Sequence, residues 1–314
     1  FQGGFTAVIW TDVVQLGIYL GCTAITFFVI LGMIPNGWEG VLAAAGPKFT
    51  VWNFSPDIHI PYTFWAGIIG GAFLTTASHG VDQLIVQRLL AARNERESKI
   101  ALLSSGVIVL FQFTLFLVIG VMLYSFYHYH PELAAPAAAD RIFPTFIVSY
   151  LPHGVRGIMV AAILAAAMSN LSSALNAMAS TTIVDFVRPF FRNNLSPASQ
   201  LRISRWFTVF WGVALAALAV LSRGVGSVLE AGLTIASITY GSMLGVFLLG
   251  VLTRRANEYG AIAGMAAGLL SMLGVWTWSS VAFTWYVLIG TVITFTVGYA
   301  ASLLSARNRL GQDD

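Results

Sequence analysis

The chain has 314 residues, of which 57% are hydrophobic and only 9% charged, and its formal net charge is +3. A soluble domain carries about 25% charged residues, so this composition and a mean hydropathy of +0.80 exclude a soluble globular protein and indicate a polytopic membrane protein. The basic residues lie in the loops, so the net charge reports topology rather than nucleic-acid binding. The single cysteine, Cys22, permits no internal disulfide and matches no metal-binding spacing.

Apolar segments that reach the roughly 20 residues needed to cross a bilayer occur about eight times along the chain. In chain order they are Ala7–Met33, Tyr62–Leu90, Ile100–Tyr127, Val155–Phe186, Leu201–Leu221, Val228–Leu252, Gly260–Trp278 and Trp285–Leu304. No Pro/Ser-rich linker divides them, so we expect one all-α integral membrane domain over residues 1–314. Residue 1 falls within what looks like a motif, and no initiator Met or signal peptide precedes it. We therefore also expect the domain to be incomplete, with its N-terminal part missing.

Basic residues cluster in alternate loops, and the positive-inside rule places such loops in the cytoplasm. The clusters are Arg88, Arg93, Arg96 and Lys99; Arg188, Arg192, Arg202 and Arg205; Arg254 and Arg255; and Arg307 and Arg309. The first segment then runs from inside to outside, and we expect a multi-pass protein of the cell membrane with a cytoplasmic C-terminus. The opposite loops include two amphipathic stretches, Gly37–Gly46 and Asp140–Leu151. Each is either a helix lying on the membrane surface or a lid over an outward pathway.

The segment Gly154–Phe186 combines small side chains with polar groups at the centre of a span. Small residues recur every four positions, so a helix would carry them as two adjacent stripes that let other helices approach closely. The stripes are Ala161, Ala165, Ser169, Ser173 and Ala177, and beside them Ala162, Ala166, Asn170 and Ala174. One interpretation is a tightly packed helix whose hydroxyls bond back to the preceding turn. The other, which the central polar cluster favours, is a cation site built from one face.

Ionisable side chains within the spans are candidate functional groups, because placing them in hydrocarbon is costly. Asp12 lies near the inner end of the first segment. It is either an interfacial carboxylate or an electrostatic partner for a cation that leaves inward. No nucleophile–base, zinc-protease or P-loop pattern is present, so we expect no enzyme.

His79 and Asp82 lie deeper in the second segment, on either side of Gly80. A continuous helix over Tyr62–Ala92 would be about 46 Å long, which exceeds the roughly 30 Å hydrocarbon core. We therefore predict a break around Ser78–Val81. Broken helices at this depth line binding cavities in many transporters. The alternative is a packing cluster in which His79 bonds to a neighbouring helix.

Four segments stand out as motifs: GGFTAVIWTDVVQ (Gly3–Gln15), HGVDQLIVQRLLAARN (His79–Asn94), AAAMSNLSSALNAMASTTIVDFVRP (Ala165–Pro189) and YGSMLGVFLLGVL (Tyr240–Leu252). In this order they resemble motifs of the sodium/solute symporter family. The resemblance implies a leucine-transporter-like helical bundle with two inverted five-helix repeats. Against that pattern the chain is a C-terminal fragment that starts at the fifth core helix, and about eight transmembrane helices are present, one of them broken.

The same resemblance implies the binding residues. The family's sodium site corresponds to the backbone carbonyl of Ala166 and the side chains of Ser169 and Asn170, and Asp12 matches a carboxylate associated with cation coupling. Asn170 departs from the usual Ser or Thr, although its amide oxygen can still act as a donor to the ion. The broken segment matches a solute and gate region, and the sixth span adds polar side chains. The solute-binding candidates are Ser78, His79, Asp82, Gln83, Thr239 and Tyr240.

We therefore expect a secondary active transporter that couples sodium entry to uptake of a small polar organic solute or anion. The family's sugar branch has Lys and Gln where this chain has Val109 and Leu233, so a monocarboxylate or vitamin-like solute is favoured over a sugar. The alternative is a transporter-like membrane sensor that binds a solute to regulate signalling. The expected partners are the solute, the lipid bilayer and sodium as the coupling ion. We expect no cofactor and no nucleic acid, and a monomer or weak oligomer.

Overall fold

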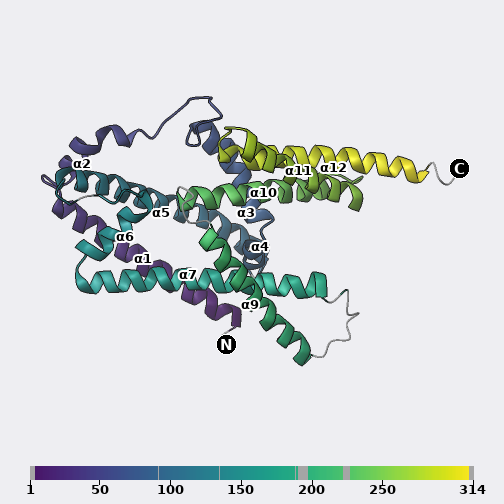
Figure 1. The fold of residues 1–314 in the computed structure, drawn as a ribbon, viewed down its shortest axis with the longest axis horizontal. Coiled ribbons are helices and arrows are strands. Elements are labelled where there is room, and N and C mark those ends of the chain that lie inside the picture. Colours follow the sequence, from purple (N-terminus) through teal and green to yellow (C-terminus); the bar gives the residue numbers. More distant parts are fainter. Residues whose placement is uncertain are drawn as a thin grey trace. The chain divides into compact units, whose positions relative to one another are not determined.

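The computed structural model describes residues 4–90, 92–133, 135–187, 189, 197–221 and 227–310, and every regular element in these ranges is a helix (Figure 1). Several basic residues of the expected cytoplasmic loops, such as Arg188 and Arg192, lie outside the described residues. The chain divides into two compact units. Unit 1 comprises Phe1–Phe49 and Ile100–Val225, and unit 2 comprises Thr50–Lys99 and Gly226–Asp314. The expectation of a single transporter domain stays a prediction.

Unit 1 is organised around the long helix that the small-residue pattern predicted. Its helices are α1 (Gly4–Met33), α2 (Trp38–Ala45), the 3-10 turn η1 (Gly46–Phe49), α5 (Glu95–Tyr129, most of which belongs here), α6 (Ala139–Tyr150), α7 (His153–Thr181), the π-helical η3 (Thr182–Val187) and α9 (Pro197–Leu221). Helix α7 packs against α1, α6 and α9. It therefore brings α1, which carries Asp12, against the stripes of small residues, where backbones can approach closely.

The two amphipathic stretches of the expected outer loops form helices α2 and α6. Val41 of α2 and Phe146 and Ile147 of α6 are buried in a core cluster with Ile30 and Phe126. The Phe126 and Phe146 rings meet edge to face with centroids 5.2 Å apart. Both helices thus bury an apolar face against other helices of unit 1. An amphipathic sequence pattern shows that one face of a helix is apolar, but it does not show whether protein or lipid covers that face.

Unit 2 contains the broken segment and the last three long helices. Its elements are the π-helical η2 (Ala66–Gly70), α3 (Gly71–Gly80), α4 (Gln83–Leu90), α10 (Val228–Leu252), α11 (Glu258–Trp278), the 3-10 turn η4 (Phe283–Trp285) and α12 (Tyr286–Leu310). Helix α3 ends at Gly80, Val81 leaves the helical conformation with ψ −14° at φ −127°, and α4 begins after Asp82. The predicted break is confirmed, with its non-helical residues at Val81 and Asp82.

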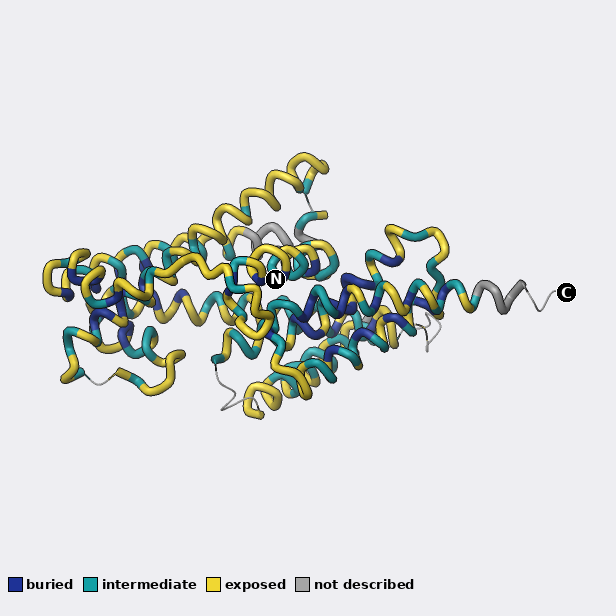
Figure 2. The backbone as a smooth tube through the Cα atoms, turned by 90° about the horizontal axis from the view of Figure 1, so that it is seen from above, coloured by how far each residue is buried: buried dark blue, intermediate teal, exposed yellow. Residues whose placement is uncertain are grey.

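Seven helices among the described residues are long and apolar enough to span a membrane. They correspond to the expected spans other than the second, whose two halves α3 and α4 are each too short to cross alone. Figure 2 shows that the helices are exposed or half-buried over most of their length, and none of the apolar stretch of α9 is buried. Apolar surface on this scale is stable against lipid or further helices, and it agrees with the membrane assignment.

Helices α10, α11 and α12 pack closely because glycines face the neighbouring helices. A Cβ atom added to Gly245 of α10 would lie 2.5 Å from Thr294 Cβ, and one added to Gly264 of α11 would lie 2.5 Å from the Thr294 carbonyl oxygen. Both distances are far below van der Waals contact, so any side chain would force the helices apart.

We therefore expect Gly245→Ala to lower the stability of unit 2 by about 1–3 kcal/mol. The matched control is Gly250→Ala on the same helix, where an added Cβ would meet nothing within 4 Å. Thermal unfolding of the detergent-solubilised protein measures the difference. Equal melting temperatures for the two variants would contradict the close helix approach.

Candidate functional site

In unit 1, two of the predicted cation-site side chains meet. The Ser169 hydroxyl on α7 donates a hydrogen bond to Oδ1 of Asp12 on α1, at 2.7 Å, and both residues are half-buried. A hydroxyl that donates to a carboxylate makes a charge-assisted bond, which is stronger than a neutral one. The small neighbours on α7 allow α1 close enough for this contact.

Further oxygen-bearing side chains lie in a hollow that Ser169 borders. The hollow measures about 420 Å³ and is lined by Thr11, Gln15, Ala165, Met168, Ser169, Ser172 and Ser173. Hydroxyl, amide and carboxylate oxygens are hard ligands, the type that alkali and alkaline-earth cations prefer. Ser172 and Ser173 were not predicted as site residues. Their spacing of three and four from Ser169 was the available signal, because it places them on the same helix face.

The other two predicted cation-site residues occupy α7 beside this pair. Ala166, one turn before Ser169, is half-buried, whereas Asn170 is exposed. Adjacent residues on a helix point about 100° apart, so Asn170 presents its amide to a face neighbouring that of Ser169. The sodium role of Ala166, Ser169 and Asn170 stays a prediction.

In unit 2, two of the predicted solute residues also meet, at the break between α3 and α4. The Tyr240 hydroxyl on α10 donates to Oδ2 of Asp82 at 2.5 Å. The other carboxylate oxygen, Oδ1, accepts from the Leu84 backbone N–H at 2.9 Å. Asp82 therefore caps the N-terminus of α4 and at the same time ties the break to α10.

The remaining solute candidates make local contacts. Ser78 Oγ and His79 Nδ1 lie 2.8 Å apart, and His79 Nδ1 lies 3.1 Å from the Thr75 carbonyl oxygen. These bonds of His79 fall within its own helix rather than reaching a neighbouring one. Thr239 is exposed and donates to the Ala236 carbonyl at 3.0 Å, and Gln83 is exposed at the start of α4.

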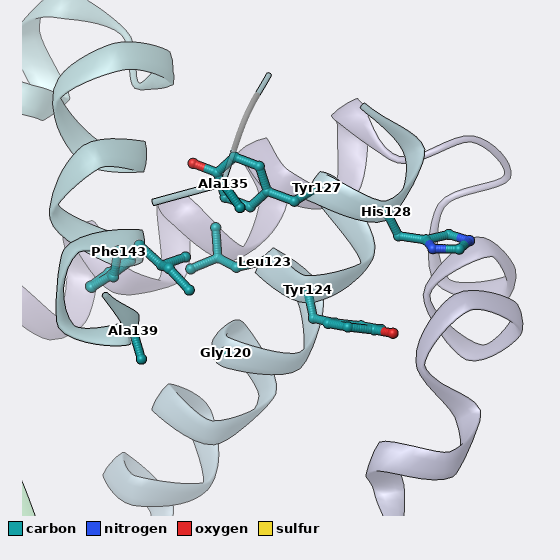
Figure 3. Close-up of a pocket in the computed structure, with 9 residues that line it drawn as sticks. Gly120, Leu123, Tyr124, Tyr127, His128, Ala135, Ala139 and Phe143 are labelled. Carbon is teal, nitrogen blue, oxygen red and sulfur yellow. The ribbon is translucent and has the colours of Figure 1, made fainter. Parts of the chain in front are cut away.

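A separate hollow in unit 1 lies at the end of α5 and beside α6. It measures about 420 Å³ and is lined by Gly120, Leu123, Tyr124, Tyr127, His128, Ala135, Ala139, Ile142 and Phe143 (Figure 3). In Figure 3 the Tyr124 and His128 rings point away from Phe143 and Ala139. The wall formed by α6 is apolar, because its lining residues are Ala139, Ile142 and Phe143. This hollow contains none of the predicted site residues.

An all-helical membrane bundle, with polar pairs beside a helix break and on a helix rich in small residues, is typical of secondary transporters. The chain belongs to the Sodium:solute symporter family, whose sequence profile matches residues 1–268. This confirms the family inferred from the four motifs. It also places the chain among multi-pass membrane transporters rather than enzymes.

Individual relatives transport different solutes. The chain is 34% identical to the human sodium-coupled monocarboxylate transporter 1, covering 87% of this chain and 45% of the relative. It is 32% identical to the human sodium/iodide cotransporter, covering 87% and 43%, and 31% identical to the sodium/sialic acid symporter NanT of Aliivibrio fischeri, covering 100% and 63%. The chain therefore spans between two fifths and two thirds of the length of these relatives.

A solved structure supports the fold. It shows a Na⁺-coupled sialic acid symporter in a substrate-bound, outward-open state with a novel Na⁺ site, and it matches with a TM-score of 0.80 at 27% sequence identity. The match covers 96% of this chain and 63% of that chain. The predicted all-α, leucine-transporter-like class is thereby confirmed.

Proposed function

We propose that the protein is a sodium-coupled symporter that takes up a small polar organic solute or anion, with a monocarboxylate or vitamin-like solute favoured over a sugar. The observation that carries the proposal is the Asp12–Ser169 pair, a carboxylate and a hydroxyl held 2.7 Å apart between two transmembrane helices. Membership of the Sodium:solute symporter family supports the same coupling ion.

In this proposal, sodium binds beside Asp12 and Ser169. The ion replaces the hydroxyl proton as the partner of the carboxylate, and the hydroxyl turns its oxygen lone pairs toward the ion. Asp12 supplies the negative charge that compensates the cation in a medium of low dielectric constant. Thr11, Ser172 and Ser173, which line the same hollow, supply neutral donors, and Ala166 and Asn170 add oxygens from the neighbouring face of α7.

The solute residues are proposed at the α3–α4 break. A hydrogen bond between Asp82 and Tyr240 fixes the position of both polar groups in unit 2. Ser78 and His79 lie on α3 just before the break, Gln83 begins α4 just after it, and Thr239 is next to Tyr240 on α10. A broken helix exposes backbone and side-chain polar groups at membrane depth, where a polar solute needs partners. The monocarboxylate, iodide, multivitamin and sialic acid relatives favour an anion or acid over a neutral sugar.

The direct test is Ser169→Ala, which removes one oxygen donor with little change in volume. We expect the sodium concentration for half-maximal uptake to rise roughly tenfold, the equivalent of one charge-assisted hydrogen bond. Initial uptake is measured against sodium concentration in proteoliposomes and corrected for protein amount. Ser180→Ala, an exposed serine on the same helix, is the matched control. An unchanged sodium dependence in Ser169→Ala would remove this serine from the site, and sodium-independent binding without uptake would favour a sensor.

The orientation is tested separately. If the basic loops are cytoplasmic, a cysteine introduced at the exposed Arg93 will react with an impermeant maleimide only in permeabilised cells, whereas one at Lys48 will react in intact cells. The native Cys22 is buried and serves as the background. Labelling of position 93 from outside would invert the proposed topology, including the cytoplasmic C-terminus.

A further inference from the structure

A small hollow in unit 2 lies where α10 ends, beside α12. It measures about 270 Å³ and is lined by Leu252, Thr253, Arg254, Arg255, Phe295 and Tyr299. The two arginines come directly after Thr253, the residue that caps the end of α10, and the two aromatic residues lie one turn apart on α12. The Phe295 and Tyr299 rings are nearly parallel, with an interplanar angle of 13° and centroids 6.4 Å apart. The hollow thus combines two guanidinium groups with a flat aromatic wall.

The charge of this hollow is not compensated within the described part of the chain. Among the described residues, the ion pairs join Lys99 to Glu95 and His130 to Glu132, and none of these four residues lines the hollow. Neither Arg254 nor Arg255 has a carboxylate partner among these residues. Both arginines are exposed. Paired guanidinium groups beside a hollow favour an anion with several acceptor oxygens, such as a phosphate.

The position of the hollow along the helices selects the source of that phosphate. Leu252 is the last residue of a candidate membrane span, so Arg254 and Arg255 are among the first polar residues beyond the hydrocarbon. On the membrane side of the hollow, Val251 of α10 is 65% exposed and Val292 of α12 is 49% exposed. An anion bound here therefore borders an apolar surface, and a lipid can occupy both at once, with its phosphate at the guanidinium groups and its acyl chains on Val251 and Val292.

The surrounding backbone holds the hollow in place. The Thr253 N–H and hydroxyl both donate to the Leu249 carbonyl, at 3.2 and 2.7 Å, which fixes the turn that carries the arginines. The glycine contact at Gly245 holds α10 directly against α12. The backbone of the turn and the packing of the two helices are therefore ordered before a ligand binds, and only the arginine side chains lose conformational entropy on binding.

We infer that this hollow binds the phosphate group of an anionic glycerophospholipid of the leaflet that borders the Arg254–Arg255 turn. The guanidinium groups donate to the phosphate oxygens, Phe295 and Tyr299 contact the glycerol and ester region as interfacial aromatic residues do, and the acyl chains follow the exposed side chains of α10 and α12. The positive-inside pattern assigns this turn to the cytoplasmic leaflet, where anionic lipids and basic residues meet. The inference is independent of which solute or ion the protein transports.

The test measures lipid binding by the full chain in detergent, using native mass spectrometry with phosphatidylglycerol and phosphatidylcholine of the same acyl chains. We expect the protein to bind one molecule of phosphatidylglycerol in preference to phosphatidylcholine. The double variant Arg254→Gln/Arg255→Gln should weaken its binding roughly twenty-five-fold, about fivefold for each guanidinium, and should leave the binding of phosphatidylcholine unchanged. Phe295→Ala, which changes no charge, should weaken it about threefold, because the apolar contact with the glycerol and ester region is lost. The matched control is Arg93→Gln/Arg96→Gln, which removes the same charge from another exposed pair.

Two results would overturn the inference. An equal loss in the Arg93→Gln/Arg96→Gln control, with no loss in Phe295→Ala, would show diffuse electrostatic attraction instead of a site. Displacement of phosphatidylglycerol by excess inorganic phosphate would show that the hollow takes a soluble anion and that the apolar border contributes nothing.

Discussion

Asp12→Asn will raise the sodium concentration needed for half-maximal uptake by at least about a hundredfold, because it removes the negative charge that balances a cation in a low-dielectric site. The substitution keeps the shape of the side chain. The asparagine oxygen can still accept the hydrogen bond that the Ser169 hydroxyl now donates to Asp12. The contact between α1 and α7 should therefore survive. A change in sodium dependence would then indicate that Asp12 and α7 bind the cation and do not serve packing alone.

The measurement is initial uptake against sodium concentration, together with the amount of protein in the membrane and its melting temperature. Asp185→Asn is the matched control, since Asp185 is an exposed carboxylate in η3 of the same unit and should leave sodium activation as in the parent. If Asp12→Asn keeps the parental sodium dependence, the carboxylate has no part in coupling, and the Asp12–Ser169 bond only joins two helices.

Asp82→Asn and Tyr240→Phe will each raise the half-saturating solute concentration about tenfold, the equivalent of one hydrogen bond to a charged group. Asn is as good a helix N-cap as Asp, so Asp82→Asn should still accept from the Leu84 N–H and α4 should still begin at Gln83. Tyr240→Phe removes only the hydroxyl. Both variants thus change the polar groups at the break without changing the break itself.

The double variant tests whether the two groups act together. Because one hydrogen bond of 2.5 Å joins them, the combined effect should be close to that of either single variant instead of the product of both. Asp57→Asn is the control, since Asp57 also accepts from a backbone N–H, that of His59 at 2.9 Å, in an exposed loop. Parental solute kinetics in both single variants, with unchanged protein amount, would show that the pair only positions α4 and that the solute binds elsewhere.

The helix break illustrates how far local reasoning extends. The segment Tyr62–Leu90 is too long for the hydrocarbon core, and Gly80 followed by the capping residue Asp82 marks where one helix stops and another starts. Both signals are local, so the break and its position were predictable. The hydrogen bond from Tyr240 was not, because Tyr240 is 158 positions away in sequence, and a polar residue on a membrane helix has no local mark of its partner.

The composition and the apolar segments were sufficient to determine the membrane class and the helical fold. A chain that spans the hydrocarbon core must satisfy its backbone hydrogen bonds internally over a fixed thickness, which leaves few alternatives. The four motifs were sufficient to determine the family. They also identified Asp12, Ser169, Asp82 and Tyr240 as candidates. Only the tertiary structure decided which candidates meet. It paired Asp12 with Ser169 across 157 positions, left Asn170 exposed, and packed one face of α2 and of α6 against other helices of unit 1. Helix–helix packing decides these pairings, because it depends on shape at contacts between distant segments, whereas periodicity records only which face of each helix is apolar.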